Sequence, residues 1–275
     1  MKTLRMILAA PGRAGGALAL AADAAGHRIV GVISRSGSMT DRFASLSSDA
    51  ELPGADLLVL ATPDDHIAST ARRLAPLAVD VPAVVHLSGF KSIDVLAPFL
   101  PRGIETGSFH PLQSLPDPET GAASLRGSWA GLTASGSLLG VLEGLATSLG
   151  MTPFALPDPV KPLYHAAASA ASNYVVAALD LAHSLFERAA VPFDALAPLT
   201  RNAVANAFAQ GPRPALTGPI ARGDWDTVRG QFEAVSPAGA DRARQFRLMA
   251  EATAITARQI FPDDALPDDL TPETS

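Results

Sequence analysis

Three polar side chains recur at four-residue intervals in the segment YHAAASAASNYV. His165, Ser169 and Asn173 occupy positions i, i+4 and i+8, with alanines between them. On a helix this spacing places all three on one face. A histidine with an ordinary pKa of about 6.5 is partly protonated near neutral pH and can deliver a proton. The segment therefore indicates a catalytic face with His165 as proton donor. The alternative is a structural histidine with satisfied hydrogen bonds.

Further candidates follow two apolar segments that have the composition of strands. HLSGF places Ser88 and Gly89 at one strand end, where the hydroxyl and the following amides could hold a substrate carboxylate. SFHPLQS places His110 and Gln113 after the next strand, which makes His110 a second candidate proton donor or substrate ligand. His86 alternates inside its apolar strand, which favours a core position.

A third polar group lies in the segment LTGPIARGDWDTV. Thr217 and Arg222 combine a hydroxyl, free amides and a guanidinium near one helix start, which suits a carboxylate. We expect Asp224 to cap the following helix, and Thr217 could be a cap as well. The chain has no cysteine, and its histidines do not form a set of three ligands at credible spacing with a carboxylate, so no metal site is expected.

The segment MILAAPGRAGGALAL has the strand-turn-helix pattern of a dinucleotide-binding fold. Of the usual fingerprint G-x-G-x-x-G only the last two glycines are present, and Ala10 stands at the first. Ala10 is tolerable there if its φ is negative, and Pro11 biases it towards extended conformations. The alternative is a turn that has lost its ligand. The expected phosphate-binding residues are Gly12, Arg13, Ala14 and Gly15.

The second expected strand ends in VISRSGS, which places Ser34, Arg35 and Ser36 at its carboxyl end. An acidic residue there would accept the ribose hydroxyls of NAD, whereas Arg35 can pair with a 2′-phosphate and the serines can donate to it. These residues predict NADP(H) as the cofactor. The alternative for Arg35 is a solvated surface position.

The segment LLVLATPDDHI ends another strand at Thr62 and Pro63, which we expect beside the cofactor. Asp64 and Asp65 follow directly, at the start of a helical stretch. For both aspartates we expect the role of helix cap.

The elements that must position these residues change in character along the chain. From Leu4 to about Pro157, short apolar runs alternate with Ala/Leu-rich helical stretches, which indicates a mostly parallel sheet with crossover helices. The expected strands are Arg5 to Ala9, Arg28 to Ser34, Leu57 to Thr62, Ala83 to Ser88, Glu105 to Phe109, Trp129 to Ala134 and Thr152 to Leu156.

After Pro157 the pattern becomes helical, with no convincing strand. The expected helices are Tyr164 to Ala190, Phe193 to Gln210, Trp225 to Val235 and Ala240 to Phe261. We therefore predict an α/β domain over residues 1–156 and an all-helical domain over residues 157–261, joined near the proline-rich LPDPVKP. Residues 262–275 are acidic and proline-rich, which predicts a disordered tail.

Composition excludes several classes of function. With 275 residues, of which 48% are hydrophobic, the chain can fill substantial cores. The formal charge of −6 and the scattered lysines and arginines argue against nucleic-acid binding and against an anionic membrane surface. No segment reaches the roughly 20 uninterrupted apolar residues of a membrane helix. We expect a cytoplasmic protein.

Seven segments, taken in order, carry a resemblance to a known family. GRAGGAL, VISRS, TPDD, VVHLSG, GSFHPLQS, LYHAAASAASNYV and LTGPIARGD resemble proteins in which a Rossmann-like domain precedes the helical domain DUF2520. The resemblance extends to about Phe261 and implies an NADP-dependent oxidoreductase. The implied architecture is similar to that of ketopantoate reductases, pyrroline-carboxylate reductases and β-hydroxyacid dehydrogenases, with a helical domain of the 6-phosphogluconate dehydrogenase C-terminal type. The family pattern begins G-A-G, from which Ala10-Pro11 departs.

The resemblance also implies roles for individual residues. The helix face that carries the three polar side chains is similar to the Lys-x3-Asn-x3-Asn helix of ketopantoate reductases. His165 stands at the lysine, Ser169 at the first asparagine and Asn173 at the second. In that class the lysine protonates the carbonyl oxygen as hydride arrives. The implied reaction is reduction of a small keto acid, with ketopantoate as one candidate and a carboxylate as the general substrate.

Other functions stay open on the same scaffold. An imine reductase, a prephenate-type dehydrogenase and a catalytically silent NADP-binding sensor or partner protein would each fit the resemblance. Related two-domain reductases often dimerise through their helical domains, and the Ala-rich faces of residues 164–190 permit close helix packing, so we expect a homodimer.

Overall fold

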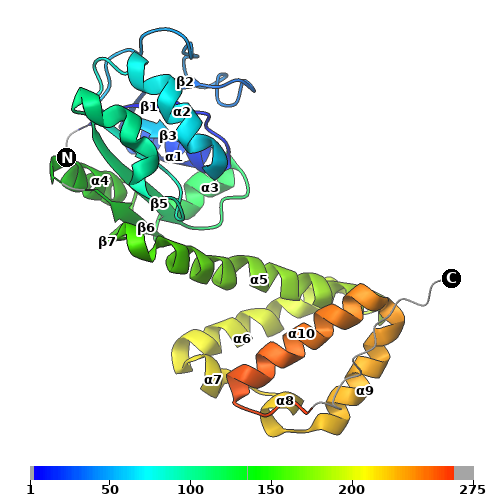
Figure 1. Ribbon diagram of the computed structural model, residues 1–275. Coiled ribbons are helices and arrows are strands. Elements are labelled where there is room, and N and C mark those ends of the chain that lie inside the picture. Colours follow the sequence, from blue (N-terminus) through cyan, green and yellow to red (C-terminus); the bar gives the residue numbers. More distant parts are fainter. Residues whose placement is uncertain (1–2, 135, 263–275) are drawn as a thin grey trace. The chain divides into compact units, whose positions relative to one another are not determined.

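The structure is a computed structural model, and it describes residues 3–134 and 136–262 (Figure 1). The chain divides into two compact units, Met1–Ala170 and Ala171–Ser275, and the division falls inside the long helix α5 (Lys161–Arg188). The expected disordered tail lies outside the described residues from residue 263 onwards. Among the described residues, no helix combines the length and the apolar character that a membrane span requires.

The first unit is built on a seven-stranded sheet in the order β2-β1-β3-β4-β5-β6-β7 (Figure 1). All neighbouring strands are parallel except β5 and β6. The mostly parallel α/β sheet predicted from the sequence is therefore confirmed, with a strand at each of the seven expected places. The strands are β1 (Arg5–Ala9), β2 (Arg28–Ile33), β3 (Leu57–Leu60), β4 (Ala83–His86), β5 (Glu105–Leu112), β6 (Trp129–Thr133) and β7 (Thr152–Ala155).

Helices cover both faces of this sheet, which explains why its central strands are apolar throughout. On one face lie α1 (Arg13–Ala24), α3 (Pro118–Leu125) and α4 (Gly136–Ser148), and on the other α2 (Ile67–Leu74) with the 3-10 segments η2 (Ala75–Leu77) and η3 (Ile93–Arg102). Two further 3-10 turns, η1 (Asp64–His66) and η4 (Asp158–Val160), precede α2 and α5.

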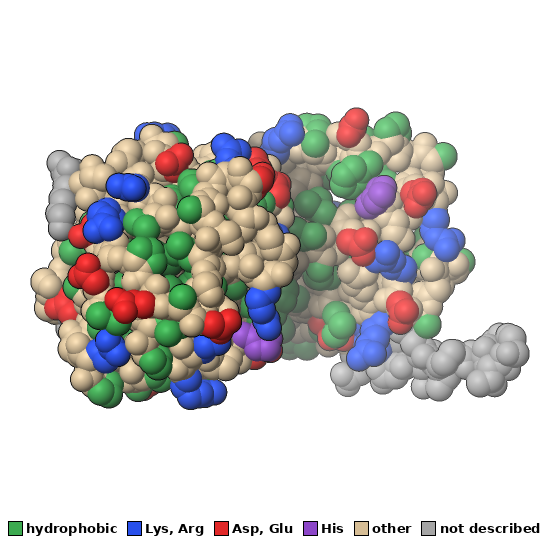
Figure 2. Space-filling model, turned by 90° about the horizontal axis from the view of Figure 1, so that it is seen from above, with side chains coloured by type: hydrophobic (Ala, Val, Ile, Leu, Met, Phe, Trp, Pro, Cys, Tyr) green, Lys and Arg blue, Asp and Glu red, His purple; other side chains and the backbone are tan. Residues whose placement is uncertain are grey.

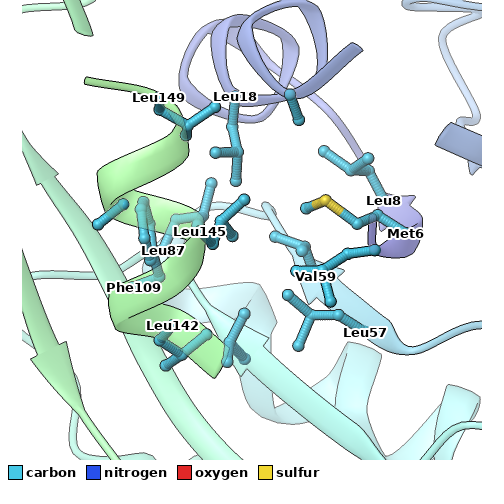
Figure 3. Close-up of a cluster of buried hydrophobic side chains, with 14 of the residues drawn as sticks. Met6, Leu8, Leu18, Leu57, Val59, Leu87, Phe109, Leu142, Leu145 and Leu149 are labelled. Carbon is cyan, nitrogen blue, oxygen red and sulfur yellow. The ribbon is translucent and has the colours of Figure 1, made fainter. Parts of the chain in front are cut away.

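Successive side chains of β1 point alternately into two separate hydrophobic cores. Met6 and Leu8 point to the α1 and α4 side and belong to the same buried core as Leu18 and Leu142 (Figure 3). Ile7 points to the opposite side and joins the core under α2 and η3. This period of two is the geometry of a strand buried on both faces.

Close packing between α1 and β3 depends on Gly15. A Cβ at this position would overlap the Cβ of Ala61, directly after β3. Gly15 therefore has the role expected of the last glycine in the fingerprint, because only a residue without a side chain lets the helix approach the sheet this closely.

Every described secondary-structure element of the second unit is a helix, as predicted. Its small core joins Val228 and Phe232 of α9 to Ala243 and Ala250 of α10. The helices after α5 are α6 (Leu196–Gln210), preceded by η5 (Phe193–Ala195), α7 (Pro212–Ala215), α8 (Pro219–Arg222), α9 (Trp225–Val235) and α10 (Ala240–Ala257), with η6 (Ser236–Ala238) between the last two.

Surface charge is mixed rather than segregated. On the face seen in Figure 2, acidic and basic side chains are interspersed. This distribution agrees with the modest formal charge of −6 and gives that face no extended field of one sign.

Candidate active site

The turn between β1 and α1 holds Ala10, which stands where the fingerprint has its first glycine, in a left-handed conformation. Ala10 has a φ of 53°, in the left-handed region that favours glycine. Its N–H donates to the carbonyl oxygen of Ile33 at 2.7 Å, and the N–H of Gly12 donates to the carbonyl oxygen of Ala10 at 2.8 Å. The condition under which Ala10 was judged tolerable, a negative φ, is therefore not met, and the bias of Pro11 towards an extended Ala10 does not prevail. These two hydrogen bonds hold the turn closed against the preference of the alanine.

The amino terminus of α1 is open towards solvent. Gly12 precedes the first helical residue, and a Cβ placed on it would meet no atom within 4 Å. The N–H groups of Arg13 and Ala14 belong to the first helical turn, where a helix offers no partner of its own. Arg13 is exposed and forms no ion pair within the described part of the chain. This end of the helix has the space, the donors and the dipole that an anionic group needs.

The end of β2 lies beside this turn, because Ile33 accepts the hydrogen bond from Ala10. Arg35 is exposed two residues further on, and within residues 3–134 and 136–262 its guanidinium has no partner. Ser34 and Ser36 share a hydrogen bond of 3.3 Å between their hydroxyl oxygens. All three residues thus lie at the carboxyl edge of the sheet with an unpaired positive charge among them.

The residues after β3 begin with the half-buried Thr62 and continue as a solvent-facing stretch. The hydroxyl oxygen of Thr62 is buried without a hydrogen-bond partner among the described residues, whereas Pro63 is exposed. The expectation that Asp64 and Asp65 cap a helix is wrong, since no side-chain cap bond forms at the start of η1 or α2. Asp64 instead accepts a hydrogen bond from Ser88 at 2.7 Å, a tertiary contact that removes it from the local cap position.

Ser88 organises the turn after β4. Its hydroxyl donates to Asp64 and accepts from the N–H groups of Phe90 and Lys91, at 3.1 and 2.9 Å. The Ser88 N–H donates to Nδ1 of His86, which is fully buried in β4 as expected. Burial is the main cause that lowers the pKa of His86 to about 3, so this histidine is neutral at pH 7. The Ser88 hydroxyl is thus engaged both by its own turn and by Asp64.

His110 lies inside β5 rather than after it, which corrects the expected strand boundary. The pairing of β5 with β4 ends at Ser108, while its antiparallel pairing with β6 continues to Leu112. Pro111 is tolerated because its missing N–H faces the side that β4 no longer covers. Gln113 follows the strand, where its side chain donates to the Ser124 carbonyl and accepts from the Ser114 N–H, at 3.2 and 2.8 Å.

The first residues of α5 bring two aromatic side chains to His110. Nδ1 of His110 and the hydroxyl of Tyr164 form a 2.7 Å hydrogen bond, and the two rings meet edge to face. The ring of His165 lies 6.3 Å from that of His110 and 6.0 Å from that of Phe90, centroid to centroid. A Cβ on Gly89 would lie 2.7 Å from Nε2 of His110. The structure thus brings together both predicted proton donors and one predicted substrate residue.

Burial sets the charge state of this cluster. It lowers the pKa of His110 to about 4, and the charges of His165 and Lys161 act in the same direction. Burial also raises the pKa of Tyr164 to about 12. Both partners of the short hydrogen bond are therefore neutral at pH 7.

Lys161, which the sequence analysis did not single out, is fully buried at the start of α5. Its ammonium group pairs with Asp158 at 2.7 Å and donates to the carbonyl oxygen of Lys91 at 3.0 Å and to the hydroxyl of Ser108 at 2.8 Å. Burial lowers the pKa of Lys161, while the hydrogen bond and charge of Asp158 oppose that shift. Each of the three ammonium protons of Lys161 thus has an acceptor. Because one acceptor is Ser108 of β5, Lys161 fixes the start of α5 to β5 and thereby positions Tyr164 and His165. In the sequence, only its position one helical turn before His165 could have pointed to Lys161.

The remaining predicted residues lie further along α5 and in the second unit. Ser169 is half-buried and belongs to the first unit, whereas Asn173 is exposed and lies beyond the division of the units. Thr217 and Arg222 are exposed near α8. Asp224 caps α9 through a 3.2 Å bond from the Thr227 N–H, which confirms the expected role.

Comparison with known proteins identifies both parts of the chain. Residues 2–111 match the Rossmann-like domain, and residues 128–253 match DUF2520, a domain of unknown function. The chain therefore joins a Rossmann-like domain to a DUF2520 domain, as the sequence resemblance implied. No curated protein matches the sequence.

Several solved structures share the fold over both domains. A Bacteroides fragilis protein provisionally described as an NADP oxidoreductase has a TM-score of 0.80 at 19% identity, with 92% of this chain and 98% of that chain covered. A Thermotoga maritima protein has a TM-score of 0.71 at 20% identity, covering 92% and 100%. Plasmodium falciparum pyrroline carboxylate reductase with NADP bound has a TM-score of 0.61 at 14% identity, covering 94% and 99%. At these identities the likeness establishes the fold alone.

Proposed function

We propose that this protein is an NADP-dependent oxidoreductase that reduces the carbonyl group of a small keto acid. The observation that carries the proposal is the open amino terminus of α1 beside Arg35 at the end of β2, which is exposed and has no partner in the part of the chain that the structure describes. An anion at the helix start and a second phosphate at a guanidinium are the two charged features by which NADP(H) is recognised. The NADP-bound pyrroline carboxylate reductase of the same fold supports this choice.

The residues present fit that cofactor. Gly12 leaves room for a pyrophosphate, which the N–H groups of Arg13 and Ala14 would hold. Arg35, with Ser34 and Ser36 on either side, would hold the 2′-phosphate. The buried, unpartnered hydroxyl of Thr62 gains a hydrogen-bond partner if a ligand lies at this edge of the sheet. Bound NADPH supplies a hydride to a substrate carbonyl carbon.

The proton needed to complete the reduction is assigned to His165. This histidine is half-buried on α5 beside His110, whose own low pKa leaves it neutral. Ser169 and Asn173 continue along the same helix and are proposed to orient the substrate. The N–H of Gly89, in the first unit, is proposed to hold its carboxylate. Thr217 and Arg222 lie in the second unit and stay candidate carboxylate ligands predicted from the sequence.

The test is NADPH oxidation against a panel of small keto acids that includes ketopantoate. We expect His165→Ala to lower kcat by roughly 100-fold or more, the range for a general acid, with NADPH affinity unchanged. His183→Ala, on an exposed histidine of the same helix, is the matched control and should keep full activity. Equal turnover of the wild type and His165→Ala would remove His165 from the mechanism.

The alternatives are separated by the same panel. Pyrroline carboxylate reductase and a reductive aminase share the fold, so cyclic imines form an additional arm. The prephenate-type dehydrogenase is tested in the opposite direction, by reduction of NADP+ in the presence of prephenate. If only an imine is turned over, the proposed substrate becomes an imine in place of a keto acid. NADPH binding without turnover of any compound would favour the sensor or partner protein.

A homodimer is proposed from the apolar surface of the helical unit. Tyr174 and Val176 of α5 are 64% and 66% exposed, Phe208 of α6 is 89% exposed, and Ile255 of α10 is 77% exposed. Large apolar side chains on α5, α6 and α10 are thus exposed in the single chain, and we propose that a second copy of the chain covers part of them. Light scattering should give twice the chain mass, and Val176→Glu should shift it towards the monomer. A wild type that stays monomeric at all concentrations would refute the dimer.

A further inference from the structure

The hydrogen bond between Tyr164 and His110 links two residues that are both neutral at pH 7. A neutral imidazole carries a single N–H, either on Nδ1 or on Nε2. Because Nδ1 faces the Tyr164 hydroxyl, the direction of this one hydrogen bond decides which nitrogen carries the proton. The chemistry that His110 can offer to a ligand depends on that choice.

The strengths of the donors and acceptors favour one direction of this hydrogen bond. Either direction leaves one polar hydrogen without a partner among the described residues, on Nε2 if the phenol donates and on the phenol if Nδ1–H donates. A phenol is the stronger donor and a neutral imidazole nitrogen the stronger acceptor of this pair. The arrangement in which the phenol donates to Nδ1 is therefore the more stable one.

The free nitrogen has a defined direction. Nε2 and its two neighbouring ring carbons are the atoms closest to the position that a Gly89 Cβ would occupy, at 2.7 to 2.8 Å. The Nε2 end of the ring therefore points over the backbone of Gly89, at the carboxyl edge of the sheet. The phenol, the edge-to-face packing of the two rings and the anchor at Lys161 together fix that direction.

We propose that Tyr164 is a positioning residue that holds His110 in the tautomer with its proton on Nε2. His110 then presents a neutral hydrogen-bond donor over Gly89, rather than a transferable proton, to a carbonyl or carboxylate oxygen. The substrate part of this inference rests on the proposed function, whereas the tautomer does not.

This assignment separates the tasks of the two neighbouring histidines. A neutral donor polarises or orients an oxygen atom without changing its charge state during the reaction. Proton delivery is left to His165, whose ring lies 6.3 Å away from that of His110. A bound oxygen over Gly89 would thus be held by one histidine and protonated by the other.

The tautomer is measured directly by NMR of the full chain labelled with 15N in its histidines, without substrate. His110→Gln identifies the signals. We expect the wild type to show Nε2–H and an unprotonated Nδ1 throughout the range around neutral pH. In Tyr164→Phe the tautomer ratio should move by about fivefold towards Nδ1–H, the effect of one ordinary hydrogen bond. Tyr174→Phe changes the other tyrosine of the chain, which is 64% exposed, and is the matched control.

The titration of His110 gives a second readout with an opposite sign for the two directions of the bond. A phenol that donates to Nδ1 stabilises the neutral ring, so its loss in Tyr164→Phe should raise the pKa of His110. A phenol that accepts from Nδ1–H stabilises the charged ring, so its loss would lower that pKa. His165, Lys161 and His86 face the same cluster and stay unchanged in both variants.

The outcomes separate this inference from the proposed function. Wild-type Nδ1–H, a lowered pKa in Tyr164→Phe, or tautomers identical in both proteins would overturn the positioning role, whatever the enzyme catalyses. If a keto acid is turned over, Tyr164→Phe should lower kcat about tenfold with NADPH affinity unchanged. Absence of turnover in the wild type, with the tautomer as expected, would contradict the proposed reaction and the substrate part alone.

Discussion

Ala10→Gly should stabilise the protein, because the native turn holds an alanine in a conformation made for glycine. The φ of 53° is fixed by hydrogen bonds on both sides of the residue, from its N–H to Ile33 and from Gly12 to its carbonyl. A left-handed conformation costs a residue with a Cβ roughly 1–2 kcal/mol, which glycine avoids. Glycine in turn loses about 0.5–1 kcal/mol more through the entropy of the unfolded chain.

The difference predicts a gain of about 0.5–1 kcal/mol in the free energy of unfolding of the first unit. For a unit of this size a gain of that magnitude raises Tm by roughly 1–4 °C. Urea unfolding followed by the fluorescence of the tryptophans and by circular dichroism measures it. NADPH affinity should stay unchanged, because Gly12 and the amides of α1 are untouched.

Ala21→Gly is the matched control, since Ala21 lies inside α1. There the same substitution should destabilise by about 1 kcal/mol, the usual difference between glycine and alanine in a helix. Opposite signs for the two variants are the expected result. Destabilisation by Ala10→Gly would show that the turn does not hold Ala10 in the left-handed region, and would refute the account of the nucleotide-binding turn.

Three further predictions follow from the buried polar groups. Lys161→Met should cost about 3 kcal/mol of unfolding free energy, because it removes the cation that pairs with Asp158 and leaves this carboxylate only its hydrogen bonds from Ser92 and Ile93. Lys161→Met with Asp158→Asn should recover part of that loss. A cost below about 1 kcal/mol in urea unfolding would contradict the anchor. Gly89→Ala should push the His110 ring aside, since the new Cβ would lie 2.7 Å from Nε2 of His110. This variant should lower turnover more than tenfold and keep the circular dichroism spectrum of the wild type. Full activity would show that His110 does not need this position. The free energy of unfolding should be constant above neutral pH and fall as the pH drops from 6.5 to 4. The pKa values of His86 and His110 are lowered in the folded protein, so over this range the unfolded chain binds protons that the folded chain does not. Each histidine contributes about 3 kcal/mol, and His86→Gln should flatten the slope, whereas a rise in stability over this range would contradict the burial of the two histidines.

The sequence was sufficient to predict the sheet, because apolar runs bounded by Gly, Pro and Asp mark strands that are buried on both faces. It did not predict that β6 runs antiparallel to β5, since the composition of a strand carries no information about its direction. The strand containing His110 was predicted three residues too short. His-Pro-Leu resembles a strand end, yet β6 continues to pair with it.

The candidate site was predicted in part. His110, His165 and Gly89 were recognised by residue type and do meet in the first unit. Lys161 was overlooked because it stands in a proline-rich join and because lysines are rarely buried.

Asp64 was misjudged for a related reason. A helix start predicts a cap, whereas the bond from Ser88 comes from 24 residues away. Local sequence patterns predict local hydrogen bonds, whereas Asp64 and Lys161 are held by hydrogen bonds to residues far away in the sequence.

The most direct test of the central claim is calorimetric titration of the protein with NADPH and with NADH. If Arg35 holds a 2′-phosphate, NADPH should bind at least tenfold more tightly than NADH. Arg35→Ala should weaken NADPH binding by about 10- to 100-fold, the loss of a charge-assisted hydrogen bond, and leave NADH unchanged. Arg73→Ala, on an exposed arginine of α2, is the matched control and should have no effect. Equal affinities for the two nucleotides, or no binding of either, would contradict an NADP site at the carboxyl edge of this sheet.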